Sequence, residues 1–395
     1  MKQVRQDPRA ADFVQDPYAF YERVRGETLF YWEDYKLVCS VDHAAVNAML
    51  RDRRFGREAP EGFRPVHPEH LKPFYDVEEH SILEREPPTH TRLRSLLVRA
   101  FTSKRIAALE PEIAALAREL VAGFDGGRVD LLPAFCERIP IVIISRLLGV
   151  PEDMADQLLA WSHDMVAMYQ VRRDRAVEDA AVKATQEFSA FIRAFIEARR
   201  ADPKDDLITS LIAARDEGAK LSTDELVTTC ILLLNAGHEA TVHGFANGIK
   251  TILESGAEPA TFFTTPERTL ATVEETLRFD PPLHMFTRYA MEDVDAFGHS
   301  FRTGDQVGLL LAGANRDPAK FARADRFDVE RGGVGHLSFG AGLHFCIGAP
   351  LAKLEMCVAL PILFERFPDI KLAGTPEYAD RYHFHGLEAL EVALY

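Results

Sequence analysis

Apolar residues recur every three or four positions along most of this chain, which is the period of one face of an α-helix. This pattern predicts helices over residues 106–124, 155–169, 177–200 and 360–367. The strand-like segments are short and lie at residues 28–40, 294–301, 306–311 and 388–394. The sequence therefore predicts a mainly α protein with a large helical portion and a small β portion.

The longest helical pattern begins at Ser222 and continues to Ser255. Ser222 and Glu225 form a capping box at its start, and Gly256 supplies a stop at its end. A helix of this length measures roughly 50 Å at the standard rise per residue. We therefore expect a long central helix that crosses the molecule.

The middle of this helix, residues 235–241, carries a glycine and an acid within an apolar stretch. Gly237 would let a flat ligand approach closely, and Glu239 is costly to bury unless it has a task. Taken alone, however, these two residues favour a kinked helix with a solvated glutamate.

The chain of 395 residues has no Gly/Ser-rich or Pro-rich linker and no internal repeat, so we expect a single domain over residues 1–395. Residues 1–25 are rich in charge and lack the apolar core of a signal peptide, and the apolar run 226–238 is too short to span a membrane. We expect a cytoplasmic protein and a monomer. The net charge of −15 argues against nucleic acid or an anionic membrane as a partner.

The five cysteines fit neither a disulfide framework nor a zinc site. Cys346 lies in a glycine-punctuated loop that leads into a helix with Pro350 in its first turn, whereas Cys357 is expected to be a packed core thiol. A thiol near a helix N-terminus has a lowered pKa, because the helix dipole favours the thiolate. A lone thiolate is a poor zinc site but a good axial ligand to haem iron. The alternative is a buried structural cysteine.

The segment Phe339-Gly-x-Gly-x-His344-x-Cys346-x-Gly348 resembles the haem-binding signature of cytochrome P-450, and every position of the signature is filled. The resemblance extends from about residue 16 to the end of the chain. It implies the cytochrome P-450 fold and a haem b whose iron is bound by Cys346.

The same resemblance assigns further residues around the haem. Glu275 and Arg278 match the family's Glu-x-x-Arg pair, with Arg326 as the third member, and their role would be structural. His90 and Arg94 are four residues apart and share a helix face, so together they suit a carboxylate. The resemblance implies that the haem propionates are bound by His90, Arg94, Arg288 and His344.

The oxygen-activation motif departs from the family pattern. Glu239 fills the position of the usual acid, but Ala240 stands where a threonine is expected, and Thr241 is rotated by roughly 100° around the helix. A hydroxyl of the substrate, an ordered water or His243 would then complete the proton relay.

Position within the family also implies a substrate pocket that is mostly apolar. We expect Asn235 and His284 to form hydrogen bonds to a substrate oxygen. The alternative, which is about as well supported, is that either side chain only satisfies a backbone hydrogen-bonding group. The expected lining is Leu232, Asn235, Ala236, Leu283, Met285, Phe286 and Phe384.

The function implied by the resemblance is that of a monooxygenase, which inserts one oxygen atom from O₂ into a small, largely apolar substrate by hydroxylation or dealkylation. No dinucleotide fingerprint is present, so electrons are expected from a separate ferredoxin or flavodoxin with its reductase. A basic cluster would steer such a partner: Arg92, Arg99, Lys104 and Arg105. The alternatives are a peroxide-driven peroxygenase and, third, a haem-binding sensor without catalytic activity.

Overall fold

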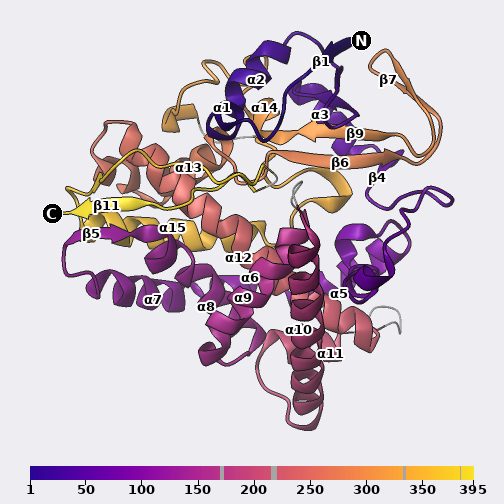
Figure 1. The fold of residues 1–395 in the computed structure, drawn as a ribbon. Helices are drawn as coiled ribbons and strands as arrows, with labels where there is room; N and C mark the ends of the chain where they lie inside the picture. The colour runs from indigo at the N-terminus through magenta and orange to yellow at the C-terminus, as the bar shows by residue number, and fades with distance from the viewer. Residues whose placement is uncertain (170–172, 215–219, 332–334, 383) are drawn as a thin grey trace. The chain divides into compact units, whose positions relative to one another are not determined.

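The computed structural model describes residues 1–169, 173–214, 220–331, 335–382 and 384–395 (Figure 1). The chain is 56% helical, as the periodicity predicted. Its residues group into two compact units. The first unit holds residues 1–63, 113–137 and 240–395, and the second holds residues 64–112 and 138–239. A single domain over residues 1–395 stays a prediction.

A six-stranded sheet organises the first unit, with the strand order β1-β2-β3-β9-β6-β4. Pairing is parallel between β1 and β2 and between β3 and β9, and antiparallel elsewhere; in the longest ladder Met285 faces Leu310. The strands are β1 (Lys2–Val4), β2 (Phe30–Trp32), β3 (Leu37–Ser40), β4 (Phe55–Gly56), β6 (Met285–Ala290) and β9 (Gln306–Leu310).

Two smaller sheets complete the β portion of the first unit. The strands β10 (Lys371–Leu372), β11 (Glu391–Leu394) and β5 (Gly127–Asp130) form one, and β7 (Val294–Ala296) with β8 (His299–Phe301) forms the other. The predicted strand segments all contain strands, but 28–40 and 294–301 are hairpins. Lys36 and Gly298 have positive φ and turn the chain within these segments.

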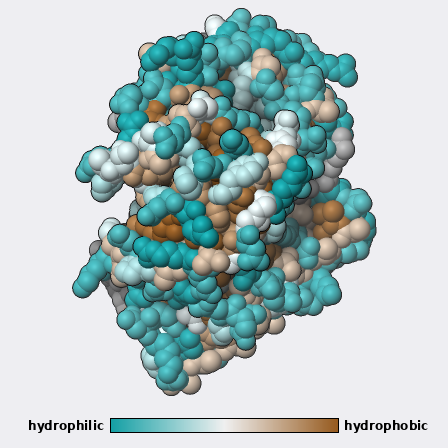
Figure 2. Space-filling view, turned by 90° about the vertical axis from the view of Figure 1, so that its left-hand side faces the viewer, coloured by the Kyte–Doolittle hydropathy of each residue, from teal (hydrophilic) through white to brown (hydrophobic). Residues whose placement is uncertain are grey.

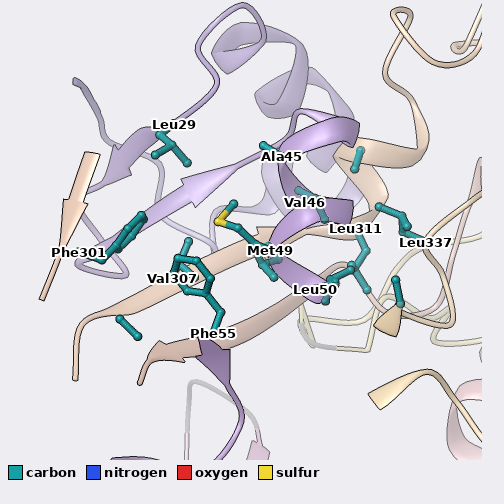
Figure 3. Packing of buried hydrophobic residues seen from close by; sticks show 14 of the residues in the cluster. Leu29, Ala45, Val46, Met49, Leu50, Phe55, Phe301, Val307, Leu311 and Leu337 are labelled. Carbon is teal, nitrogen blue, oxygen red and sulfur yellow. The ribbon is translucent and has the colours of Figure 1, made fainter. Parts of the chain in front are cut away.

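Helix α3 (His43–Arg51) buries its apolar face in a core cluster of the first unit. Ala45, Val46, Met49 and Leu50 project from this helix toward strand residues such as Val307 (Figure 3). The helices found wholly in this unit are α1 (Ala11–Gln15), α2 (Pro17–Val24), α3, α13 (Pro266–Phe279), α14 (Leu311–Asn315) and α15 (Ala349–Arg366).

The described residues of the second unit form helices and loops without a strand. Its helix α10 (Arg175–Ala201) packs against α9 (Ala155–Val166), α4 (Lys72–Glu78) and α11 (Leu207–Ala213). Trp161 of α9 stacks on Phe188 of α10 with ring centroids 5.2 Å apart. The other helices of this unit are α4 (Lys72–Glu78), α5 (Thr89–Ala100), α6 (Ser103–Ala107), α8 (Arg138–Leu148) and α11 (Leu207–Ala213).

The predicted long helix is α12 (Thr223–Glu254), which begins in the second unit and ends in the first. The capping box is present, because Ser222 N donates to Glu225 Oε2 over 2.8 Å and Glu225 N donates to Ser222 Oγ over 3.1 Å. Gly256 follows the helix with a φ of 72°.

One predicted helix is wrong, because residues 106–124 contain the end of α6 and a separate helix, α7 (Glu110–Ala122). Pro111 explains the break, since a proline inside a helix lacks the N–H of the next hydrogen bond and clashes with the carbonyl four residues earlier. The predicted helix 360–367 is the end of α15, which already begins at Ala349.

Several one-turn helices connect these elements. They are η1 (Glu69–Leu71), η2 (Ile82–Glu84), η4 (Glu152–Met154), η5 (Ala167–Tyr169), η6 (Pro259–Phe263), η7 (Val329–Arg331), η8 (Gly342–His344) and the π-helical turn η3 (Leu132–Cys136).

Hydrophilic residues cover most of the face drawn in Figure 2, with hydrophobic residues showing between them. Among the helices of the described residues, none combines the length and the apolar character that crossing a membrane requires.

Candidate active site

The loop that carries Cys346 joins η8 to α15 in the first unit. Gly340 and Gly342 have φ values of 68° and 70°, which favour glycine. A Cβ at Gly342 would lie 2.5 Å from the carbonyl oxygen of Leu50, and one at Gly340 would lie 3.2 Å from the ring of Phe286. These two glycines therefore let the loop pack closely against α3 and β6, within the protein itself.

Cys346 is the exposed member of the five cysteines, none of which forms a disulfide. Its backbone N–H donates to the carbonyl of Phe339 over 3.0 Å, which closes the loop just before α15 begins at Ala349. Cys357, on α15, is partly buried, and burial raises the pKa of its thiol to about 12. Cys346 therefore has the accessibility that an iron ligand needs, and Cys357 remains a protonated thiol.

The four expected propionate partners fall in both units. Arg288 on β6 is buried and donates to the carbonyl of Thr287 over 2.8 Å, while His344 ends η8 and is partly exposed. In the second unit His90 and Arg94 lie one turn apart on α5, the former buried and the latter partly exposed. Arg288 and His344 thus belong to the first unit, and His90 and Arg94 belong to the second.

Glu275 and Arg278 form a fully buried ion pair on α13, with both side chains 0% exposed. The contact is bidentate, since Arg278 Nε donates to Oε2 over 2.7 Å and Nη2 donates to Oε1 over 2.8 Å. The remaining Arg278 donors bind backbone carbonyls at 2.9 Å. These carbonyls belong to Asn315, Ala324 and Arg326.

The third member of this network differs from the expectation. Arg326 contributes only its carbonyl, and the guanidinium that reaches Glu275 Oε1, at 3.4 Å, belongs to Arg331. The N–H of Asp328 also donates to Glu275, over 2.8 Å. Arg331 was missed because it lies five residues beyond Arg326, and only the folded path of the chain brings it to the pair.

Asn315, which the sequence reasoning also missed, ties this network to the start of the cysteine loop. Its side chain accepts from Leu337 N over 2.7 Å and donates to Ser338 Oγ over 2.9 Å. Ser338 in turn donates to the carbonyl of Leu277 on α13 over 2.7 Å. The loop is therefore fixed to α13 at the point where it begins.

In the middle of α12, Glu239 is buried at 4% exposure, and its Oε1 lies 3.5 Å from Nε2 of His163 on α9. Gly237 departs from the expectation, because a Cβ there would meet Ile144 of α8 at 3.2 Å. This glycine therefore serves close helix packing. His163 was missed because nothing in its local sequence indicates that an acid lies near it.

Ala240 and Thr241 follow Glu239 on α12, the former partly exposed and the latter buried. His243 is also buried, and it packs so closely on Gly386 that a Cβ there would lie 2.0 Å from its Nδ1. Its ring is held in the first unit by this contact, which explains the glycine at position 386.

The expected pocket residues have different surroundings. Leu283 and Phe384 pair in an isolated β-bridge. Met285 departs from the expectation, because it is buried in a core cluster with Cys39 and Leu310, and Phe286 projects to the opposite face of β6 toward Gly340.

Three further pocket residues lie on α12 in the second unit: Leu232 and Asn235 are partly buried, and Ala236 is exposed. The amide nitrogen of Asn235 is 3.7 Å from the sulfur of Met165, and its buried Oδ1 has no donor among the described residues. His284 is enclosed in the first unit, where its Nδ1 lies 2.9 Å from the hydroxyl of Tyr21. His284 thus has a side-chain partner within the protein, whereas the expected hydrogen bond to a substrate oxygen stays a prediction.

Comparison with known proteins decides the family. Residues 268–375 match the family model described as Cytochrome P-450. The chain is 33% identical over 403 residues to the polyketide biosynthesis cytochrome P-450 PksS of Bacillus subtilis (strain 168), covering 98% of each chain. It belongs to the cytochrome P-450 family.

Other relatives of this cytochrome P-450 agree. The monooxygenase PikC of Streptomyces venezuelae is 35% identical over 395 residues, covering 96% of this chain and 92% of PikC. The crystal structure of P450BioI with hexadec-9Z-enoic acid ligated acyl carrier protein superposes with a TM-score of 0.91 at 30% identity, covering 98% and 99% of the two chains. The structure of PksS gives a TM-score of 0.89.

Members of this family are haem-thiolate oxidoreductases whose iron is bound through a cysteine. The residues of this cytochrome P-450 fit that cofactor, because an exposed thiol lies at the entry to α15, and Arg288 and His344 of the same unit carry N–H donors of the kind that bind carboxylates. The predicted family, fold class, enzyme class and cofactor are therefore confirmed.

The basic cluster is less positive than its sequence indicates. Arg92 pairs with Glu225 in a contact that neutralises both groups, and Arg105 lies 3.3 Å from Asp205. Arg99 and Lys104 are exposed on α5 and α6. Arg99 and Lys104 are thus the more exposed half of the cluster, and Arg92 and Arg105 are the less exposed half.

Proposed function

We propose that this cytochrome P-450 inserts one oxygen atom from O₂ into a C–H bond of a small, largely apolar substrate, by hydroxylation or dealkylation, using electrons from a separate ferredoxin or flavodoxin system. The observation that carries the proposal is Glu239, a buried acid in the middle of α12 with a titratable partner, His163, at 3.5 Å. A buried carboxylate beside an imidazole is suited to proton transfer.

Cys346 is the proposed iron ligand, and it binds through the thiolate that the start of α15 favours. The bound haem supplies the iron at which dioxygen is activated. His90, Arg94, Arg288 and His344 would orient it through charge-assisted hydrogen bonds to its carboxylates. Phe339 and Gly348 belong to the loop that presents Cys346.

Glu239 is proposed to carry the proton that the reaction consumes, and His163 to replenish it. Ala240 removes the hydroxyl that most members of the family place beside the acid, and Thr241 points elsewhere on the helix. A polar group of the substrate or an ordered water would complete the relay. Asn235, whose buried Oδ1 has no donor among the described residues, is the proposed group that positions a substrate hydroxyl.

The iron ligand is tested by the spectrum of the reduced protein with carbon monoxide. The wild type and Cys357→Ser should both show the long-wavelength band of thiolate ligation, and Cys346→Ser should lose it. Retention of the band in Cys346→Ser, with its loss in Cys357→Ser, would overturn the assignment.

The source of electrons is tested by product formation with ferredoxin, its reductase and NAD(P)H, set beside hydrogen peroxide alone. Charge reversal of Arg99 and Lys104 to Glu should slow only the ferredoxin route, and more at low salt, because steering between exposed charges is screened by ions. A matched reversal of Arg128 and Lys371, which are exposed in the first unit, should slow neither route. Fast peroxide turnover without ferredoxin activity would favour a peroxygenase.

Glu239→Gln keeps the shape of the side chain and removes its acid. We expect slower turnover with O₂ at unchanged substrate affinity, since the proton is needed only after the substrate has bound. Unchanged turnover would remove Glu239 from the mechanism.

A substrate carried on a protein is the second candidate, and it rests on the likeness to a relative solved with an acyl chain on its carrier protein. Titration with a free fatty acid and with the same acid on acyl carrier protein distinguishes the two. A Soret shift with only the carrier-bound acid would favour this candidate.

A further inference from the structure

Three potential metal ligands meet where α9 packs beside α12 in the second unit. His163, His238 and Glu239 each offer one ligand atom, and these atoms lie within 4.8 Å of one another. His238 is 0% exposed and Glu239 is 4% exposed, whereas the His163 side chain is 44% exposed. His238 and Glu239 are thus buried in the protein interior, whereas His163 is accessible to a cation from solvent.

The orientation of His238 is the strongest indication of a ligand. Its Nδ1 lies 2.8 Å from the carbonyl of Leu234, and because a carbonyl can only accept, Nδ1 carries the proton. The lone pair is therefore on Nε2, which is buried and has no partner among the described residues. This arrangement, with one ring nitrogen bonded to a carbonyl and the other bare, is the one found in histidines that bind metals.

Nε2 of His238 is therefore the ring nitrogen through which this residue could bind a cation. An unpaired buried imidazole nitrogen costs free energy, and a bound cation would recover it.

We propose that His163, His238 and Glu239 bind a divalent cation of the Zn²⁺ class. Two imidazoles and one carboxylate, with a remaining position for water, are a ligand set that zinc accepts. Tetrahedral zinc with bonds of about 2.0–2.1 Å places its ligand atoms roughly 3.3 Å apart. His163 Nε2 and Glu239 Oε1 are already 3.5 Å apart, and the exposed His163 ring can turn to complete the site.

Binding at this site has a consequence for catalysis. A cation would occupy the Glu239 carboxylate and the His163 lone pair, so neither group could carry a proton, and turnover would fall. This consequence rests on the proposed function of Glu239, whereas the cation site itself does not.

A second cluster of the same composition, Asp280, His284 and His385 in the first unit, is a weaker candidate. The two carboxylate oxygens of Asp280 accept hydrogen bonds from the hydroxyls of Tyr18 and Tyr378. All three of its members are buried, so it offers no exposed ligand through which a cation enters. A variant of Asp280 therefore shows whether bound zinc lies in this second cluster and not in the first.

The test is equilibrium dialysis of the haem-loaded enzyme against Zn²⁺, with zinc and iron counted per chain. The wild type should bind one zinc at micromolar concentrations. His163→Gln and His238→Ala should each weaken it by at least the ten- to hundredfold that loss of an outer-shell partner costs. The His163 side chain is half-exposed, so His163→Gln should disturb packing little. This variant therefore still tests the site if His238→Ala lowers the stability of the fold.

His70→Ala is the matched control, because His70 forms a similar imidazole–carboxylate pair with Glu178, at 2.7 Å in the same unit, but is not part of a three-ligand cluster. It should bind zinc like the wild type. Equal affinity in all four proteins, or loss of zinc on Asp280→Asn alone, would overturn the proposal. Zinc that binds at the site without slowing turnover would overturn only the role of Glu239.

Discussion

Two buried glutamates of the first unit, one on α13 and one on the neighbouring α15, have opposite surroundings. Glu275 is 0% exposed and accepts from Nε and Nη2 of Arg278, from the N–H of Asp328 and from Nε of Arg331. Glu355 is 1% exposed, and neither of its oxygens has a hydrogen-bond partner among the described residues. Burial raises the pKa of Glu355 well above its ordinary value.

The difference shows that two equally buried carboxylates can differ completely in their hydrogen bonding. Donors surround Glu275, and every guanidinium nitrogen of its neighbour Arg278 has an acceptor, so neither group of the pair is left without partners. Glu355 is buried without a donor among the described residues, and this burial disfavours its charged form and raises its pKa. The region around α13 therefore depends on intact ion pairing, whereas the region around Glu355 depends on pH.

The largest expected effect comes from Arg278→Ala. It leaves Glu275 buried without its main partner and frees three backbone carbonyls, so we expect the unfolding free energy to fall by about 3–5 kcal/mol. The midpoint of urea unfolding, followed by circular dichroism, measures this loss. Arg268→Ala is the matched control on the same helix, because its contact with Glu330 is largely exposed and should be worth less than about 1 kcal/mol. Equal losses in the two variants would contradict the comparison.

The sequence predicted the Glu275–Arg278 pair at the centre of the first region and made no prediction about Glu355. The three-residue spacing of Glu275 and Arg278 indicated a pair, but their three acceptor carbonyls lie 37 to 48 residues further along the chain, where no local pattern marks them. The long helix with its capping box followed from local rules. His163 beside Glu239 and Asn315 beside Leu337 did not, because both contacts depend on tertiary packing.

The next effect is a pH dependence that Glu355 contributes. Its pKa is raised in the folded protein, so the folded state binds a proton that the unfolded state has lost above about pH 4.5. The unfolding free energy therefore falls by up to about 1.4 kcal/mol for each pH unit between the unfolded and the folded pKa. Glu355→Gln removes this proton, so its stability relative to the wild type should rise with pH over that interval.

Urea unfolding of the wild type and Glu355→Gln at several pH values from 5 upward checks this slope, because the unfolded state has lost the proton above about pH 4.5. Glu254→Gln is the control, since Glu254 on α12 is exposed beside Lys250, and its difference from the wild type should stay constant. A constant difference for Glu355→Gln as well would mean that Glu355 is ionised in the fold.

The smallest effect concerns Glu274, which adjoins Glu275 on α13 but is partly exposed and links this helix to α15. It accepts from His336 Nε2 at 2.7 Å and from Lys353 Nζ at 2.9 Å. Burial pushes the pKa of Glu274 up, but the hydrogen bonds from His336 and Lys353 bring it below its ordinary value. Glu274 is therefore an intermediate case, because both hydrogen-bond donors and solvent stabilise its carboxylate, whereas Glu275 relies on Arg278.

Lys353→Met should accordingly cost only about 0.2–1 kcal/mol, because water still reaches this partly exposed ion pair and His336 still donates to the carboxylate. The loss should shrink further at high salt, where ions screen the exposed charge, whereas the loss in Arg278→Ala should persist. Urea unfolding of both variants at low and high salt measures the two responses. A salt-independent loss of several kcal/mol in Lys353→Met would mean that Glu274 depends on its cationic partner as strongly as Glu275 does. The stability that each carboxylate contributes would then be set by its partners and not by its exposure to solvent.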